Sequence, residues 1–504
     1  MNYEDLDALS LAALVRKREV SPRELVDEAI ARIERFDGRV NAVVWRSFER
    51  ARRHAERGAP GSTPASPFFG VPFLLKDLMA QDEGEPSTYS TRLLESWRAP
   101  YDCELVSRYK RAGLIVIGRT NTPEFGIYGV TEPALRGPTR NPWDLSRTPG
   151  GSSGGSSAAV AARYVPMAHG GDGGGSIRIP AAHTGLVGLK PTRARNPSGP
   201  FSGERWAGFV AEHALTRSVR DSAALLDLTH GSDPGAPYDV LPPARPYLEE
   251  VALGAAGKGR RLTIAVSVEP LFGRKTHADN TAAVVAAARL CEALGHRVVE
   301  ARPAFDKAPL IKAYFTVIAA STNVAVRAAA EYAGRAPTSR DFEPATWLLK
   351  VIGDKLTAGE YAHALQTIQL AHRRVAPFFE HHDVFLTPTA AAPPVEVGAF
   401  ALDPLQRALI AGLSAAPARP LLMKALDALG QSAMDATPNT MLFNMTGQPA
   451  VSLPLHWNAA GLPIGTQWVG RFGDEATLFQ LAAELEVAAP WAHKKPPILL
   501  GPPL

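Results

Sequence analysis

Hydrophobic and polar positions along the chain follow two different periods, one typical of helices and the other of strands. Over residues 5–36 the apolar residues recur every three to four positions, which predicts two amphipathic helices. Ser21, Pro22 and Glu24 match the start of the second helix, because serine caps the first turn, proline fits its first position and glutamate bonds back to the cap. The chain is therefore expected to begin with a helical segment.

Further along, short apolar runs alternate with longer helical patterns. The runs predict strands at 71–75, 114–118, 262–267, 297–300, 384–387, 449–455 and 464–469. Helices are predicted at 158–162, 218–229, 280–294, most of 308–380 and 474–486. Strands that alternate with helices are typical of a layered α/β sheet.

The distribution of these elements predicts a domain organisation. No internal repeat is present, and we expect an N-terminal helical segment at 1–60 packed on one α/β domain at 61–504. Within that domain we expect a core at about 70–230. Helical stretches at about 305–380 and 400–440 lack neighbouring strands, so they are expected to be insertions that shape the entrance of a pocket.

The composition of the chain argues against some kinds of binding partner and some cellular locations. The 504 residues include 54 basic and 50 acidic side chains, and this net charge of +4 is too small for the chain length to indicate nucleic acid or anionic lipid. Cys103 and Cys291 cannot form a disulfide framework, and the N-terminus lacks an apolar signal, so we expect a cytoplasmic protein. The longest apolar-looking stretch, 408–422, is too short and too interrupted to cross a membrane.

Neither a cofactor nor a metal is indicated by the motifs. The adjacent His381 and His382 cannot chelate a metal as an i, i+4 pair on a helix does. No Gly-Lys-Ser/Thr ending follows the glycine runs, as a Walker-type phosphate loop requires. We therefore expect chemistry that side chains and backbone groups perform alone.

One glycine run ends at a serine. Gly173, Gly174 and Gly175 precede Ser176, and a turn of three glycines lets backbone N–H groups converge on one point. A serine at the end of such a turn is placed to attack a carbonyl while the N–H groups hold the developing oxyanion. A phosphate-binding turn or a flexible loop has the same local sequence, so the run alone leaves these alternatives open.

A second serine lies upstream in another glycine run. Gly150-x-Ser152-x-Gly154 fits the nucleophile elbow of α/β-hydrolases, which would make the chain an esterase with Ser152 as nucleophile and a histidine as base. That elbow follows a strand, whereas 144–149 has the composition of a loop. None of the 13 histidines lies in a distinctive motif, so this alternative also stays open.

A lysine and an Asp/Arg pair complete the candidate residues. Lys76 follows the apolar run 71–75, and burial there would lower its pKa, so that its neutral form could accept a proton from a serine. A strand would direct Lys76 and Asp77 to opposite faces. Asp172 and Arg178 flank the glycine turn and are expected to pair across it, in a structural role.

The combination of these motifs resembles the amidase signature family. The resemblance rests on the runs 150–156 (GGSSGGS), 172–181 (DGGGSIRIPA) and 185–192 (GLVGLKPT), together with Lys76-Asp77, 121–126 (NTPEFG) and 444–450 (NMTGQPA). These motifs extend over most of the chain. A narrower resemblance, to bacterial hydrolases of 6-aminohexanoate cyclic dimer, rests on 139–145 (TRNPWDL), 168–170 (AHG) and Pro490-Trp491.

The resemblance implies a layered α/β/α fold with a central mixed, twisted sheet, and hydrolysis of a carbon–nitrogen amide bond without a cofactor. It implies that Ser176 is the acylated nucleophile, that Ser152, joined to Gly151 by a cis peptide bond, shuttles protons, and that Lys76 is the base. The N–H groups of residues 173–176 are then expected to form the oxyanion hole. The implied partners are a small amide substrate and water, and the family is compatible with a homodimer.

The chain departs from the family pattern beside Asp172. Gly171 and Gly173 stand where the family usually carries Thr-Asp-Thr or a similar sequence, so a changed pocket shape is expected. Substrate contacts are expected in variable segments. The residues chosen for this role are Tyr128, Thr131, Asn323 and Phe443.

Two further alternatives remain at this point. One is the amidase subunit of a tRNA-dependent amidotransferase, which takes ammonia from glutamine inside a complex of several subunits. The other is a scaffold that keeps the fold without turnover. The presence of Lys76, Ser152 and Ser176 together argues against the second.

Overall fold

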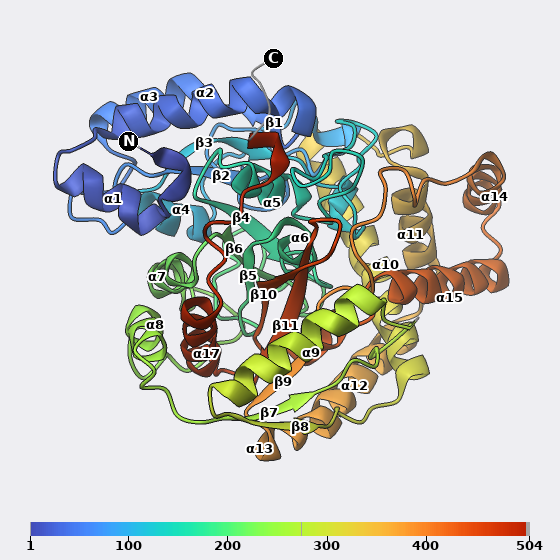
Figure 1. Cartoon of the computed structure of the whole chain (residues 1–504). Helices are drawn as coiled ribbons and strands as arrows, with labels where there is room; N and C mark the ends of the chain where they lie inside the picture. Colours follow the sequence, from blue (N-terminus) through green and yellow to red (C-terminus); the bar gives the residue numbers. More distant parts are fainter. Residues whose placement is uncertain (1, 274, 500–504) are drawn as a thin grey trace.

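The computed structural model describes residues 2–273 and 275–499, and a sheet of 11 strands runs through the molecule (Figure 1). The strand order is β1-β3-β2-β4-β6-β5-β10-β11-β9-β7-β8. The strands are β1 (Val43–Arg46), β2 (Pro72–Lys76), β3 (Ile115–Thr120), β4 (Met167–Asp172), β5 (Val187–Lys190), β6 (Ala211–Thr216), β7 (Thr263–Val266), β8 (Arg297–Glu300), β9 (Val384–Pro388), β10 (Ala450–Trp457) and β11 (Pro463–Gly470). β2 pairs in parallel with β3 and β4, and β7 with β8 and β9, whereas the other pairs are antiparallel.

Helices cover this sheet, so the predicted α/β fold with a mixed central sheet is confirmed. In the first half they are α1 (Ala8–Arg16), α2 (Pro22–Val40), α3 (Phe48–Arg57), α4 (Glu104–Arg111), α5 (Gly154–Ala161), α6 (Arg178–Thr184), α7 (Val219–Thr229) and α8 (Tyr247–Ala255). In the second half they are α9 (Ala278–Ala293), α10 (Lys307–Ala333), α11 (Pro344–Lys355), α12 (Ala358–Val375), α13 (Phe378–His381), α14 (Pro404–Ala415), α15 (Arg419–Ala436), α16 (Met441–Thr446) and α17 (Glu475–Ala488).

The predicted strands correspond to β2, β3 and β7 to β11, but β1, β4, β5 and β6 were missed. β4 contains two glycines and two polar residues in the sequence MAHGGD, so its composition resembles that of a loop. It becomes a strand because β2 and β6 pair with it on both sides, and all six of its residues are buried. Tertiary pairing outweighs local propensity here, and this strand leads directly into the glycine turn.

The N-terminal helices lie over the end of the sheet that carries β1 and β3 (Figure 1). The side chain of Ser21 accepts from the N–H of Glu24, whose carboxylate in turn accepts from the Ser21 backbone N–H, which is the predicted capping box. The buried side of α2, including Leu25, Ile30 and Ile33, joins the same hydrophobic core as β2 and β3. This packing supports the strand end at which Lys76 lies.

A second core lies under the helices of the C-terminal half and includes α10. Among the described residues, α10 is the single helix whose length and composition would suit a membrane span, and 61% of its most apolar window is buried inside the protein. Within the described part of the chain, α10 rather than 408–422 is thus the segment that meets the length and composition of a membrane span. Its burial is what the core helix of a folded domain shows.

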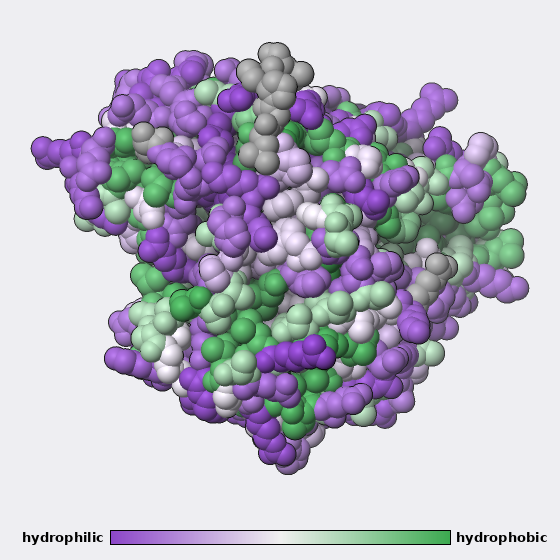
Figure 2. Space-filling model, in the orientation of Figure 1, coloured by the Kyte–Doolittle hydropathy of each residue, from purple (hydrophilic) through white to green (hydrophobic). Residues whose placement is uncertain are grey.

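Apolar side chains are exposed on the outlying helices at the right of Figure 1. Leu405 and Leu409 of α14 and Leu421 of α15 are all more than half exposed. Figure 2 shows apolar surface gathered at this edge and further apolar patches in the lower half of the same face.

Candidate active site

The C-terminal end of β2 places Lys76 in the interior. The strand is buried throughout and Lys76 itself has no exposed surface. Its Nζ lies 2.7 Å from Oγ of Ser152 and 3.3 Å from the carbonyl oxygen of Gly171. Asp77 points elsewhere and accepts hydrogen bonds from the backbone and hydroxyl of Thr88, as strand alternation predicts.

Burial controls the protonation of this lysine. Removal of the ammonium group from water lowers the pKa of Lys76 to about 7, although the negative charges of Asp172 and Glu212 oppose the shift. A substantial fraction of Lys76 is therefore neutral near pH 7. A neutral amine beside a serine hydroxyl is able to accept a proton from it.

Ser152 lies at the turn that leads into α5. The Gly151–Ser152 peptide bond is cis, where the resemblance implied one. A side chain at position 151 could not be accommodated, since its Cβ would approach the Val130 backbone to 2.7 Å. No strand precedes this turn, so within the described part of the chain Ser152 does not have the context of a nucleophile elbow.

Ser176 ends the turn between β4 and α6. The backbone N–H of Ser153 donates to the Ser176 carbonyl at 3.1 Å, which joins the two serine segments. Among residues 2–273 and 275–499, the Ser176 hydroxyl makes no hydrogen bond to protein, and both serines face the same cavity. In enzymes, a hydrogen bond between a reacting hydroxyl and its proton acceptor often forms only when substrate is bound.

The N–H groups of the turn differ from the prediction at one position. The Gly175 N–H donates to Oδ1 of Asp172 at 2.7 Å and is therefore occupied. The N–H groups of Gly173, Gly174 and Ser176 have no acceptor among the described residues. Three donors of the predicted four are thus free to bind an oxyanion.

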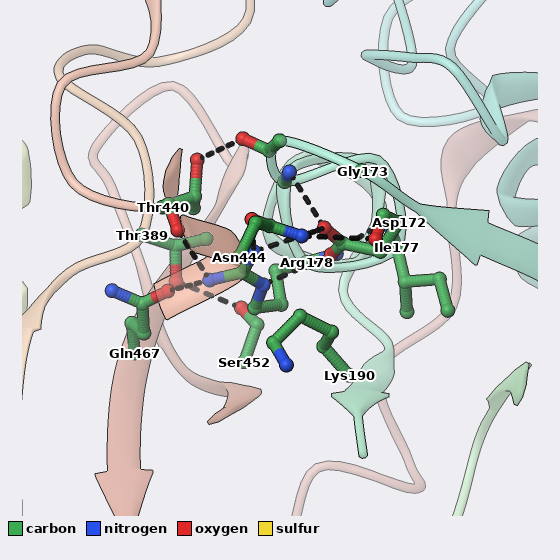
Figure 3. Close-up of polar contacts among 12 residues, drawn as sticks. Asp172, Gly173, Ile177, Arg178, Lys190, Thr389, Thr440, Asn444, Ser452 and Gln467 are labelled. Carbon is green, nitrogen blue, oxygen red and sulfur yellow. Dashed lines mark hydrogen bonds and ion pairs between the residues drawn. The ribbon is translucent and has the colours of Figure 1, made fainter. Parts of the chain in front are cut away.

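Asp172 and Arg178 form the predicted pair, with both side chains fully buried. The Arg178 guanidinium donates to both carboxylate oxygens at 2.9 Å. Burial by itself raises the pKa of Asp172, but the Arg178 charge and hydrogen bonds outweigh it and hold that pKa well below the usual range. Figure 3 shows this pair at the centre of a hydrogen-bonded group with Asn444 and Gln467.

A histidine behind Lys76 was not singled out from the sequence. His169 Nδ1 accepts from the Lys76 backbone N–H at 3.4 Å, so its proton resides on Nε2, which lies 3.1 Å from Glu212. Burial lowers the pKa of His169 despite the Glu212 carboxylate. Within the described residues, no histidine makes a hydrogen bond or ion pair with Ser152 or Ser176.

The two serines and Lys76 open onto a cavity of about 640 Å³. Small residues of α10 line one side, namely Ala320, Ser321, Ala325, Ala328 and Ala329. Aromatic residues line much of the remainder, namely Tyr89, Phe125, Phe201, Trp206, Tyr332 and Tyr361. Two further charged residues, Glu204 and Arg205, lie on the wall. The Arg205 guanidinium donates to the Glu212 carboxylate at 2.8 Å.

The four residues expected to contact substrate do not line this cavity. Thr131 donates to the Gly150 carbonyl, and Asn323 donates to the Lys350 carbonyl and the Asp354 carboxylate. Phe443 is fully buried in the second core, and Tyr128 also lies outside the cavity wall. Alternation and composition cannot identify lining residues whose segments are brought together only by the fold.

The unusual glycines beside Asp172 make room for cavity residues. A Cβ at Gly173 would lie 2.8 Å from the Trp206 ring, and one at Gly171 would lie 2.7 Å from the Met79 methyl group. Both Trp206 and Met79 line the cavity. The changed pocket shape expected from the sequence is consistent with these two contacts.

Comparison with known proteins places this site in a family. The Amidase family model matches residues 24–479. The 6-aminohexanoate-cyclic-dimer hydrolase of Paenarthrobacter ureafaciens is 36% identical over 98% of this chain and 97% of its own length. A solved structure of 6-aminohexanoate cyclic dimer hydrolase complexed with substrate superimposes with a TM-score of 0.87 at 36% identity, covering 99% of this chain and 100% of the other. A bacterial aryl acylamidase of the amidase signature family gives 0.81 at 27% identity, with 99% of both chains covered.

The fold and the matched family define an amide hydrolase. The chain belongs to the amidase signature family. The resemblance drawn from its glycine and serine motifs is thereby confirmed, including the narrower similarity to the cyclic-dimer hydrolases.

Proposed function

We propose that this enzyme cleaves amide bonds through an acyl-enzyme on Ser176, with Ser152 as proton shuttle and Lys76 as base. The observation that carries the proposal is the 2.7 Å contact between Lys76 Nζ and Ser152 Oγ, buried at the floor of the cavity that also contains Ser176. A pKa of about 7 for Lys76 supports its role as a base near neutral pH. The histidine-dependent esterase lacks such support, because no histidine is bonded to either serine in the described structure.

The chemistry proceeds in two halves. Neutral Lys76 takes the Ser152 proton, Ser152 takes the Ser176 proton, and Ser176 Oγ attacks the amide carbonyl carbon. The oxyanion accepts from the free N–H groups of the turn, and each such donor contributes about 3–4 kcal/mol to the barrier reduction. The proton then returns through Ser152 to the leaving nitrogen, the C–N bond breaks, and water hydrolyses the ester by the same proton route.

The cavity favours a neutral substrate with apolar segments. Its wall is dominated by alanine and aromatic side chains, and the Arg205 charge is already paired. The small residues of α10 leave width for a ring. We therefore propose cyclic or linear amides with alkyl or aryl segments, including the cyclic dimer of 6-aminohexanoate for which the relatives are named.

Hydrolysis assays with the purified chain alone test this function. We expect release of free amine from 6-aminohexanoate cyclic dimer or from an aryl amide, and loss of that release in Ser176→Ala. Failure of the purified chain on every amide, or retention of full activity in Ser176→Ala, would contradict the proposal. Turnover that required glutamine and added subunits would instead favour the amidotransferase alternative.

A further inference from the structure

In the glycine turn between β4 and α6, the three consecutive carbonyl groups of residues 172–174 are each bound by a side chain from the second half of the chain. Nδ2 of Asn444 donates to the Asp172 carbonyl at 2.9 Å. The Tyr314 hydroxyl donates to the Gly173 carbonyl at 3.0 Å, and the Thr440 hydroxyl donates to the Gly174 carbonyl at 2.6 Å. Figure 3 shows Thr440 and Asn444 reaching the turn from this side.

These contacts determine where the N–H groups of the turn point. In a trans peptide the C=O and N–H of one unit lie on opposite sides of the chain. A donor that holds the Asp172 carbonyl therefore directs the Gly173 N–H away from itself, and Tyr314 does the same for the Gly174 N–H. These are two of the three N–H groups that have no acceptor in the described structure.

The glycines of the turn are explained by the same contacts. A Cβ at Gly174 would lie 2.6 Å from the Tyr314 hydroxyl, and one at Gly175 would lie 2.4 Å from the Thr440 hydroxyl. Gly175 also has a φ of +131°, which disfavours any side chain. The donors thus approach the turn so closely that only glycine fits.

The three donors are themselves held in place. Tyr314 is buried in α10 and stacks on Phe209 with ring centroids 5.3 Å apart and an interplanar angle of 6°. Burial raises the pKa of Tyr314, so its hydroxyl stays protonated and can donate. Asn444 accepts from Arg178 at 2.5 Å, while Arg178 also donates to the Thr440 carbonyl at 3.0 Å.

We propose that Tyr314, Thr440 and Asn444 are positioning residues of the oxyanion hole. Asn444 and Tyr314 aim the free N–H groups of Gly173 and Gly174, whereas Thr440 fixes the next peptide unit, whose Gly175 N–H donates to Asp172, and so preserves the shape of the turn. The proposal rests on the proposed function, because it assumes that the turn after β4 stabilises the oxyanion formed at Ser176. It assigns a role in the reaction to three side chains that do not themselves need to touch substrate.

Conservative substitutions with matched controls test this role. Tyr314→Phe removes the hydroxyl and keeps the ring stack, and Thr440→Val keeps the side-chain volume. The control Tyr3→Phe removes an equally buried hydroxyl that donates to a carbonyl at 3.0 Å, in the N-terminal segment. The control Thr229→Val removes a buried hydroxyl bonded at 2.9 Å within α7.

We expect kcat to fall about 10- to 100-fold in Tyr314→Phe and in Thr440→Val with KM within twofold, because small misplacements of catalytic groups have effects of this size. The affinity of a trifluoromethyl ketone analogue, whose adduct with the serine is an oxyanion, should fall in parallel. The two controls should match wild type in kcat. Melting temperatures of all four variants separate this effect from unfolding.

Three results would overturn the proposal in different ways. If Ser176→Ala is inactive but both turn variants keep kcat and analogue affinity within twofold of their controls, the positioning role is wrong and the proposed function stands. If Ser176→Ala remains active, the proposed function fails and the positioning role fails with it. A loss of kcat with unchanged analogue affinity would also contradict the role in oxyanion binding.

Discussion

Lys76 and Ser152 meet at 2.7 Å in a fully buried position, although 75 residues separate them in the chain. β2 delivers the lysine from one segment, and the turn before α5 delivers the serine from another. The contact requires a lysine that can lose its proton, since a buried ammonium would hold the serine hydroxyl only as an acceptor. Removal of either partner should therefore affect chemistry more than folding.

Substitution of Lys76 tests its role as base. We expect Lys76→Met to lower kcat about 10²- to 10⁴-fold, the range for loss of a general base, without lowering the free energy of unfolding at pH 8. Lys190→Met is the matched control, because burial likewise lowers the pKa of Lys190 to about 7. Within the described residues its Nζ donates to the Pro191 carbonyl alone, and Lys190 lies outside the cavity wall. Equal losses in the two variants would argue against a special role for Lys76.

The pH dependence of kcat/KM should follow the ionisation of Lys76. Burial lowers the pKa of this residue to about 7, and the protonated form cannot accept a proton. Activity should therefore rise with pH through about 7 and level off above it, falling about tenfold per unit on the acid side. A profile with its limb near the ordinary lysine value would contradict the burial argument.

The buried Asp172–Arg178 pair should contribute strongly to stability. Arg178→Met leaves the Asp172 carboxylate buried without its partner, and we expect a loss of about 3–5 kcal/mol in the free energy of unfolding. Arg374→Met is the comparison, since Arg374 pairs with Asp306 on the surface, where both are more than half exposed. That variant should lose no more than about 1 kcal/mol. Similar losses measured by denaturant titration would show that burial is not the cause.

The width of the cavity should depend on the small residues of α10. Ala325→Phe places a ring in the cavity wall, so kcat/KM for the cyclic dimer should fall more than for a small linear amide. The control Ala325→Ser keeps the side chain small and should preserve the ratio between the two substrates. If Ala325→Phe lowers both substrates equally, α10 does not select by size.

Sequence motifs could predict Lys76, Ser152 and Ser176 at the floor of the cavity. They could also predict the buried Asp172–Arg178 pair beside the glycine turn, since all five residues lie in short runs of distinctive composition. The apolar periods also predicted most strands of the sheet. The cavity wall could not be predicted this way, because 124–126, 201–210 and α10 converge only through long-range packing.

The glycine turn illustrates the same limit at atomic scale. Its composition indicated free N–H groups, yet the Gly175 N–H is bound by Asp172 three positions earlier. The contacts of Tyr314 and Thr440 with the turn join residues more than 140 positions apart, and no local pattern encodes them.

The identity of the nucleophile is the central claim, and mapping a covalent adduct tests it most directly. The protein is treated with a fluorophosphonate, digested, and the modified serine is located by mass spectrometry, with Ser176→Ala and Ser152→Ala treated in parallel. We predict a single adduct on Ser176, absent in Ser176→Ala and formed slowly in Ser152→Ala. An adduct on Ser152 that persists in Ser176→Ala would contradict this account and favour the histidine-dependent hydrolase.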